Sequence, residues 1–467
     1  MLFNSKTYKI KNWWIQFWST KDLLKKFLFT SLLLTLFVIG TTITLPFIQI
    51  TNPNQLSDNS FLNTLNLIGG GGLRQFSIFA LGISPFINAS LIMMILQTKV
   101  FPPVYKLSQS GPQGRKKINV ITRVLTLVIA FPQAIFLTKG LTTGDNPFIS
   151  INPGTTGLTT SFLAYFALPL ILVSASLFVL FISEQITNKG VGNGTSLIIF
   201  AGIAARLPFQ FQSAFVTYVQ GATEGSGTLV GIINFATYIL VYLIVIVIVT
   251  IVYVAERHIP IQQVGAGRSK NKKEIGKLPI KLNPAGIMPI IFAMMVLSFP
   301  GMIANILPNT SASKQWINAN LQFTKPLGFS LLLVIIFFFS LIMGIQQSKV
   351  DKIAEDFAKS STFIPGVRPG EETQDYLIAI VFRLSVFSSI YLLVLGSMQF
   401  VEIMTGVLNQ AISFGGTSIM ILVSTSLETI SQIQARNKTN KLAKAKRLTL
   451  SNIESDNEDD KVEGLLW

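Results

Sequence analysis

Long apolar runs separated by polar segments dominate the sequence from about residue 27 onward. A transmembrane α-helix needs roughly 20 predominantly apolar residues. Ten runs approach or exceed this length, at about 27–48, 76–97, 118–140, 161–183, 195–215, 229–254, 284–307, 328–346, 376–400 and 408–427. The fifth is the weakest, because Arg206 and Pro208 interrupt it. The pattern predicts an all-α polytopic membrane protein with ten transmembrane helices.

A short separate segment at 60–73 precedes the second run and ends in Gly69–Gly72. Four consecutive glycines lower helix stability and give the backbone unusual freedom. We expect a half-helix here that ends in a flexible joint.

The composition agrees with a membrane protein. Half of the 467 residues are hydrophobic and 12% are charged, whereas soluble proteins carry roughly 25% charged residues. The chain has no Cys and a single His, His258, which excludes thiolate metal sites, Cys nucleophiles and sites built on paired histidines. We therefore expect no metal and no cofactor.

The distribution of charge orients the predicted helices. An even number of spans places both termini on one side. If that side is cytoplasmic, 31 of the 37 basic residues are cytoplasmic and Arg383 lies within a span; this is the bias of the positive-inside rule. The remaining five are Arg74, Lys139, Arg206, Lys314 and Lys325. The net charge of +16 further indicates contact with anionic lipids.

Two predicted cytoplasmic loops, 255–283 and 347–375, are too long for simple helix connections. Their composition fits solvated linkers and docking surfaces for a cytoplasmic partner equally well. Residues 1–26, with six Lys and three Trp, indicate a cytoplasmic amphipathic segment. Residues 437–467 form a charged cytoplasmic tail whose change from basic to acidic is typical of a disordered, solvated segment.

The predicted spans lack the chemistry of an enzyme or of an ion-coupled transporter. Arg383 is the clear ionisable residue inside them and Glu402 lies at a span end. We interpret Arg383 as a structural residue that pairs with a neighbouring helix or snorkels to the interface. No paired carboxylate or Ser–base arrangement lies at membrane depth, so we expect no catalytic residues. A secondary transporter with inverted repeats stays as the alternative function.

Five motifs resemble the SecY-type channel subunits of bacterial protein translocases. They occur in that family's order, and the resemblance covers about residues 20–436. The motifs are GGGLRQFSIFALGISPFINAS (70–90), EQITNKGVGNG (184–194), LPIKLNPAGIMP (278–289), IPGVRPGE (364–371) and FGGTS (414–418).

The resemblance implies two inverted five-helix halves, 27–215 and 216–436, around an hourglass pore with a plug half-helix at about 60–75. It implies a protein-conducting channel in the bacterial plasma membrane that translocates unfolded preproteins and releases membrane segments laterally. The implied pore ring is Ile83, Ile87, Ile199, Ile291 and Ile421, with Thr195 at a position where the family has an apolar residue. The implied plug residues are Leu62, Gly69, Gly70, Gly71, Gly72, Leu73 and Arg74. The implied lateral-gate residues are Asn88, Ser90, Gln133 and Asn283, and Met94 replaces the family's gate glutamine.

The same resemblance implies SecE and SecG as partner subunits, and SecA, the ribosome and signal sequences as cytoplasmic partners. The two long loops then become docking surfaces. The implied docking residues are Arg257, Arg268, Lys270, Lys272, Lys273, Arg368 and Glu371. Arg368 lies between Pro365 and Pro369, which would hold it at a rigid loop tip.

Overall fold

The computed structural model describes residues 21–51, 66, 69–97, 101–142, 148–152, 159–220, 226–263, 276–304, 311–408, 412–413 and 415–463. These residues are mainly helical. In chain order the helices are α2 (Lys21–Thr42), α5 (Ser84–Leu96), α6 (Pro102–Gln109), α7 (Gly111–Thr142), α8 (Thr160–Phe162), the π-helix η1 (Leu163–Ala167), α9 (Leu168–Lys189), α10 (Gly194–Phe215), the π-helix η2 (Val216–Gln220), α11 (Ser226–Val254), α12 (Met288–Ala304), α13 (Ala312–Asn320), α14 (Pro326–Ser348), α15 (Val350–Lys359), α16 (Glu371–Met404) and α17 (Gly416–Glu463).

Each of the ten predicted apolar runs overlaps a helix in this part of the chain. Within the described residues, seven helical segments are long and apolar enough to cross a bilayer: 21–42, 111–142, 160–189, 194–220, 229–254, 326–359 and 371–404. Apolar helices at 84–96 and 288–301 are shorter. The prediction of a helical, multi-span membrane protein is therefore confirmed.

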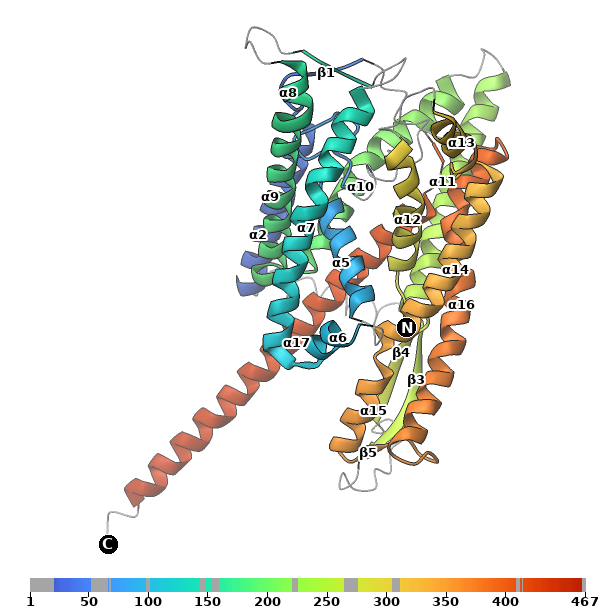
Figure 1. The fold of residues 1–467 in the computed structure, drawn as a ribbon. Helices are drawn as coiled ribbons and strands as arrows, with labels where there is room; N and C mark the ends of the chain where they lie inside the picture. The colour runs from blue at the N-terminus through green and yellow to red at the C-terminus, as the bar shows by residue number, and fades with distance from the viewer. Residues whose placement is uncertain are drawn as a thin grey trace.

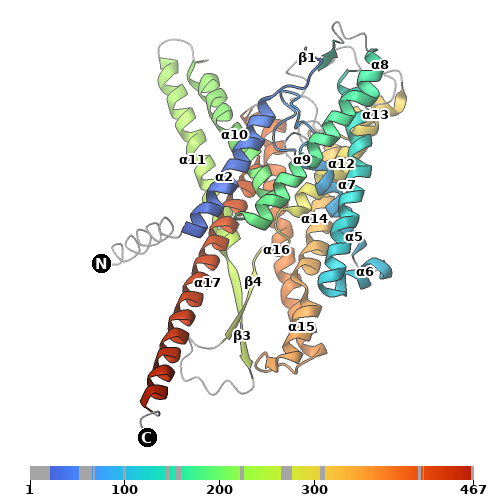
Figure 2. The same cartoon turned by 90° about the vertical axis from the view of Figure 1, so that its left-hand side faces the viewer.

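The two chain halves lie beside each other (Figure 1). Helices α2, α5, α7 and α9 stand on the left, and α11, α12, α14 and α16 stand on the right. At the top, strand β1 (Ile48–Ile50) pairs antiparallel with β2 (Ile149–Ile151). The lower end carries α6, α15 and a second sheet, and α17 extends beyond this end in both views (Figures 1 and 2).

The second apolar run does not form a helix over its whole length. Residues 76–83 form turns, bends and an isolated bridge from Ser77 to Thr44, and α5 begins only at Ser84. The reason is local: Gly82 has φ +52° and Pro85 lies in the first turn of α5, where proline is tolerated because its missing amide would be unpaired anyway. In the described part of the predicted plug, Asn66 is helical and 69–75 form turns and a bend.

The fifth helix is more regular than expected. Helix α10 continues through Arg206 and Pro208, and η2 extends it to Gln220. Arg206 packs against the glycine segment, since a Cβ atom at Gly71 would contact Arg206 Cδ at 3.5 Å. Its side chain is thus part of a packed contact and does not end the helix.

The described parts of the two long loops fold together into one small subdomain. Strands β3 (Glu256–Gln263) and β4 (Gly276–Lys281) form an antiparallel hairpin, and β5 (Thr362–Phe363) pairs with the far end of β3. The sheet packs on α15 and α16 around its own buried apolar core, which includes Ile259, Ile280, Val350, Ile364 and Leu377. Solvated linkers would not bury such residues, so that interpretation of the loops is wrong.

The prediction of a disordered tail is also wrong. Helix α17 continues from its apolar first part to Glu463 without a break. Extension of an existing helix avoids the cost of nucleation, and residues 441–448 consist mainly of Lys, Ala, Leu and Arg, which favour helix.

Candidate functional site

The five isoleucines predicted to form a constriction lie in one buried cluster. Ile83 and Ile87 come from the region of α5, Ile199 from α10, Ile291 from α12 and Ile421 from α17, and each is at most 6% exposed. We call this group, with its buried neighbours Phe37, Phe79, Leu91, Phe292 and Met343, the central cluster. It joins residues of both chain halves, and its five isoleucines carry no polar side-chain group.

The glycines of the predicted plug serve close packing. Gly70 and Gly71 have φ +87° and +88°, a conformation that favours glycine. A Cβ atom at Gly202 of α10 would clash with the backbone of Gly70, and one at Gly82 would clash with Gly69. Leu73 is fully buried and Arg74 is exposed. Leu62 lies outside the described residues.

Thr195 lies in the first turn of α10, one turn before Ile199 of the central cluster. Its Oγ1 is 3.1 Å from Ser183 Oγ of α9, and its backbone amide donates to Asn193 Oδ1 at 3.1 Å. The hydroxyl is therefore occupied by a contact with α9.

Two of the predicted gate residues, Gln133 and Asn283, form hydrogen bonds within their own halves. Gln133 of α7 donates to Ser84 Oγ at 2.9 Å. Asn283 donates to the carbonyl of Gly286 at 3.2 Å and accepts a bond from Ser388 Oγ at 2.6 Å. Asn88 and Ser90 are half-buried on α5. We call the boundary of α5 and α7 with α12 and α14 the gate seam. Helix α7 contacts α12 there, a hydrogen bond joins α14 to α5, and the central cluster includes residues of α5, α12 and α14.

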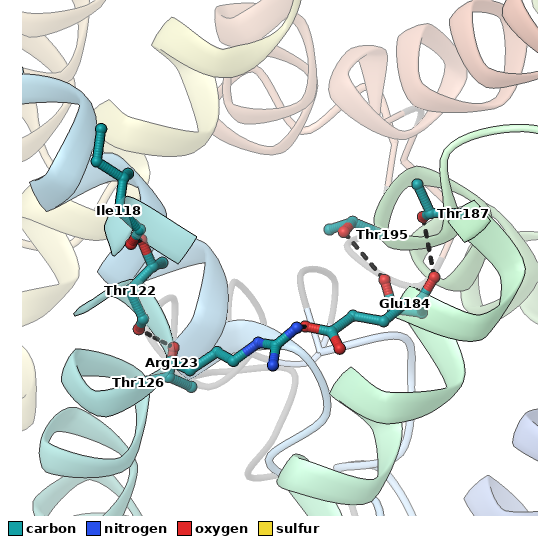
Figure 3. A network of polar contacts seen from close by, with 8 residues as sticks. Ile118, Thr122, Arg123, Thr126, Glu184, Thr187 and Thr195 are labelled. Atoms are coloured by element: carbon teal, nitrogen blue, oxygen red, sulfur yellow. Dashed lines mark hydrogen bonds and ion pairs between the residues drawn. The ribbon is translucent and has the colours of Figure 1, made fainter. Parts of the chain in front are cut away.

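A polar network braces the lower end of the first half (Figure 3). Arg123 of α7 forms an ion pair with Glu184 of α9, with Nη2 2.8 Å from Oε1. Beside it, Thr187 donates to the carbonyl of Ser183 and accepts from the amide of Gly194. The sequence analysis did not single out Arg123; opposite charges at neighbouring helix ends were the available signal.

Arg368 is one of three predicted docking residues that the structure describes, and all three are exposed. Its side chain is 87% exposed, and Nη1 lies 3.9 Å from Glu372 Oε1. Thr373 donates to its carbonyl at 2.7 Å, which fixes the loop to the start of α16. Glu371, at the start of α16, and Arg257, near the start of β3, are also exposed. Arg268, Lys270, Lys272 and Lys273 lie outside the described residues.

Arg383 does not pair with a neighbouring helix among the described residues. Its side chain is exposed on α16, which leaves snorkelling as its interpretation. Within the same residues, no group of three His, Cys, Asp or Glu side chains gathers.

Comparison with known proteins identifies the family of this chain. The SecY family model matches residues 77–430. The chain belongs to the SecY family.

Relatives named protein translocase subunit SecY share this assignment. The subunit of Mycoplasma capricolum is 36% identical over 89% of this chain and 87% of its own, and that of Bacillus subtilis is 35% identical over 90% and 96%. Two solved structures have the same fold. A protein-conducting channel superposes with a TM-score of 0.60 at 19% identity, covering 90% of this chain and 94% of its own. Sec61 of the canine ribosome–channel complex superposes with a TM-score of 0.57 at 19% identity, also covering 90% of this chain and 94% of its own.

Membership of the SecY family determines the function class. The chain is a protein-conducting channel subunit of a membrane translocase and not an enzyme. The alternative of a secondary transporter is set aside by the same findings.

Proposed function

We propose that the chain forms a pore through which unfolded preproteins cross the plasma membrane, and that the central cluster is its closed constriction. The observation that carries the proposal is the convergence of five buried isoleucines from both halves. Branched aliphatic side chains bind no particular peptide and exclude water from a narrow empty channel. When a chain enters, they can fit around any sequence.

The predicted ten spans, in two inverted halves of five, give this pore its walls. The glycine segment 69–72 would form the joint of the plug, next to the central cluster. Its two positive φ angles and close backbone contacts support a tightly seated segment whose packing depends on glycine. The gate seam would open toward lipid, so that an apolar signal sequence can partition out sideways. Opening then follows from preferential binding of that sequence to the open state.

Crosslinking tests the pore directly. A photoreactive amino acid is placed at 83, 87, 199, 291 or 421, and a secretory chain is stalled in the channel. Position 251 on α11 is the control, since Ile251 is 63% exposed on an apolar helix. We expect adducts from the five positions and few from 251. Equal labelling at all six positions would contradict the proposal.

The cytoplasmic face is the second part of the proposal. The subdomain of β3, β4, β5 and α15, together with both termini, would face the cytoplasm and meet the ribosome or the motor SecA, while SecE and SecG complete the membrane complex. The ribosome-bound Sec61 relative supports the ribosomal partner. Because the chain has no Cys, single cysteines can report the orientation. One at Lys359 should resist an impermeant thiol reagent from outside, and one at Ser311 should react; labelling at 359 would contradict it.

Arg368 is the proposed docking contact. Its guanidinium can hold a carboxylate or phosphate through two bonds, whereas an ammonium gives only a point charge. We expect Arg368→Glu to abolish driven preprotein import, and Arg368→Lys to retain part of it. Because the residue is exposed, melting temperature should change little. A loss of melting temperature that parallels the loss of import would instead make the Glu372 pair a structural brace.

A further inference from the structure

One hydrogen bond crosses the gate seam near its cytoplasmic end. Gln346, close to the end of α14, donates from Nε2 to the backbone carbonyl of Met94 in α5 at 3.1 Å. Met94 lies in the last turn of α5, where helix carbonyls lack their regular amide partners. The second half of the chain thus supplies a donor to a carbonyl at the end of a helix in the first half.

The surroundings of this bond make it breakable. Gln346 and Gln97 line a groove of about 840 Å³, whose walls come from α6 and α7 on one side and α14, α15 and α16 on the other. Two thirds of the lining side chains are polar, including Tyr105, Asn119 and Lys349. Water in such a groove can solvate both groups once the seam opens. The bond therefore stabilises the closed state by a modest net free energy. When it breaks, neither the donor nor the acceptor is left buried without a hydrogen-bond partner.

The bond differs from the other polar contacts of the gate. Gln133 and Asn283 are paired inside their own halves, so separation of α5 from α12 leaves those bonds intact. The Gln346–Met94 bond is lost when the halves separate. Its loss is a direct cost of opening, in addition to that of exposing the central cluster.

We propose that Gln346 is a specificity-determining latch of the gate: its bond to Met94 helps to set how strongly a signal sequence must bind before the seam opens. The proposal rests on the proposed function of the gate seam. A strong signal sequence shifts the equilibrium almost completely and gains little from a weaker latch. A weak signal sequence populates the open state only partly, so a weaker latch raises the open population in proportion to the change in the opening equilibrium.

The size of the effect follows from ordinary hydrogen-bond energetics. A net contribution of roughly 0.5–1.5 kcal/mol corresponds to about a two- to tenfold change in the ratio of open to closed channels. Import of a weak-signal preprotein should change by a similar factor, and import with a strong signal should not.

The test uses the full chain with its partner subunits in inverted membrane vesicles. One preprotein is prepared with an intact signal sequence and with a shortened apolar core, and the protease-protected fraction is measured. Gln346→Leu and Gln346→Glu both remove the donor at similar size. Gln346→Lys keeps a donor, which a helix C-terminus also favours. Gln347→Leu is the matched control, because Gln347 is the exposed neighbour on the same helix.

We expect Gln346→Leu and Gln346→Glu to raise weak-signal import about two- to tenfold, with strong-signal import unchanged. Gln346→Lys and Gln347→Leu should behave like the unaltered chain. The latch is overturned if Gln347→Leu has the same effect as Gln346→Leu, if Gln346→Lys raises import as much as Gln346→Leu, or if no variant changes weak-signal import. In those cases strong-signal import still supports the proposed function. Absence of strong-signal import by the unaltered chain would overturn the proposed function itself.

Discussion

The two halves of the chain meet along two contacts of different chemistry. At the gate seam the central cluster contributes mainly aliphatic side chains, among them Ile87 of α5, Ile291 of α12 and Met343 of α14, and the Gln346 bond joins α14 to α5. On the other side, which we call the back seam, α10 meets α11 and α17. Here Gln210 donates to the carbonyl of Ser413 at 3.0 Å, and Arg436 donates to the carbonyl of Gly190 at 2.7 Å.

Aromatic rings reinforce the back seam. Phe211 of α10 meets Tyr242 of α11 edge-on at 5.3 Å between ring centroids, and Phe215 meets Phe235 in the same way at 5.5 Å. Edge-to-face pairs and directional hydrogen bonds fix a relative orientation, whereas aliphatic contacts in a membrane can be exchanged for lipid tails at low cost. For the sideways opening proposed above, this difference predicts that the halves stay joined at the back seam and separate at the gate seam.

The largest expected effect concerns the closed state itself. Replacement of Ile83 and Ile291 together by Gly opens a path through the central cluster, since a narrow apolar constriction is what keeps an empty pore dry. We expect the fold to persist and small ions to leak, measured as conductance in reconstituted bilayers. Removal of residues 62–72 should have the same result. Unchanged conductance would mean that these residues do not close a pore.

The next effect should appear at the back seam. Phe211→Ala removes a ring that packs edge-on against Tyr238 and Tyr242, and should lower the free energy of unfolding by about 2–3 kcal/mol. Phe209→Ala is the control on the same helix, because Phe209 is 59% exposed, and should cost far less. Thermal melting in detergent compares the two. Equal losses would remove the distinction between a fixed seam and a mobile one.

A smaller loss of stability is expected when the hydrogen bond from Arg436 to the Gly190 carbonyl, also in the back seam, is removed. Arg436→Met keeps most of the side-chain bulk but removes the charged donor to Gly190, at a cost of about 1 kcal/mol for a half-buried site. Gln434→Met, at an exposed position on the same helix, should be neutral. Denaturant titration separates them. If Arg436→Met instead raised weak-signal import like Gln346→Leu, the bond would belong to the gating equilibrium.

Sequence patterns predicted the parts of the molecule that repeat along a helix or match a family motif. The ten apolar runs each overlap a helix, and the five isoleucines predicted for the constriction share one cluster. The ends of helices were harder to predict from the sequence. The start of α5 depends on the left-handed conformation of Gly82, and the continuation of α17 depends on a helix already formed before the charged tail begins.

The contacts between distant residues could not be predicted from the sequence. Gln346 bonds to a backbone carbonyl 252 positions away, and a carbonyl carries no side-chain signal. The folded subdomain was equally hidden, because its core is shared between two loops whose apolar residues are sparse in each loop alone. The Gln346 bond becomes visible only when the two halves are placed together, and the subdomain only when the two loops of the second half are.

The smallest expected effect on stability concerns an ion pair inside the first half. Because this pair belongs to neither seam, it tests whether only contacts between the halves control opening. The Arg123–Glu184 pair joins α7 to α9, with side chains 54% and 31% exposed. Exposed pairs contribute roughly 0.2–1 kcal/mol and are screened by salt. We expect Arg123→Glu and Glu184→Arg each to destabilise slightly, and the double exchange to recover about half a kcal/mol. Denaturant unfolding at low and high salt measures this coupling. Because the pair does not cross between the halves, none of the three variants should change weak-signal import. The contrary outcome is that breaking the pair raises weak-signal import and the double exchange reverses this rise. The rigidity of the first half would then also control opening, and the two seams alone would not explain it.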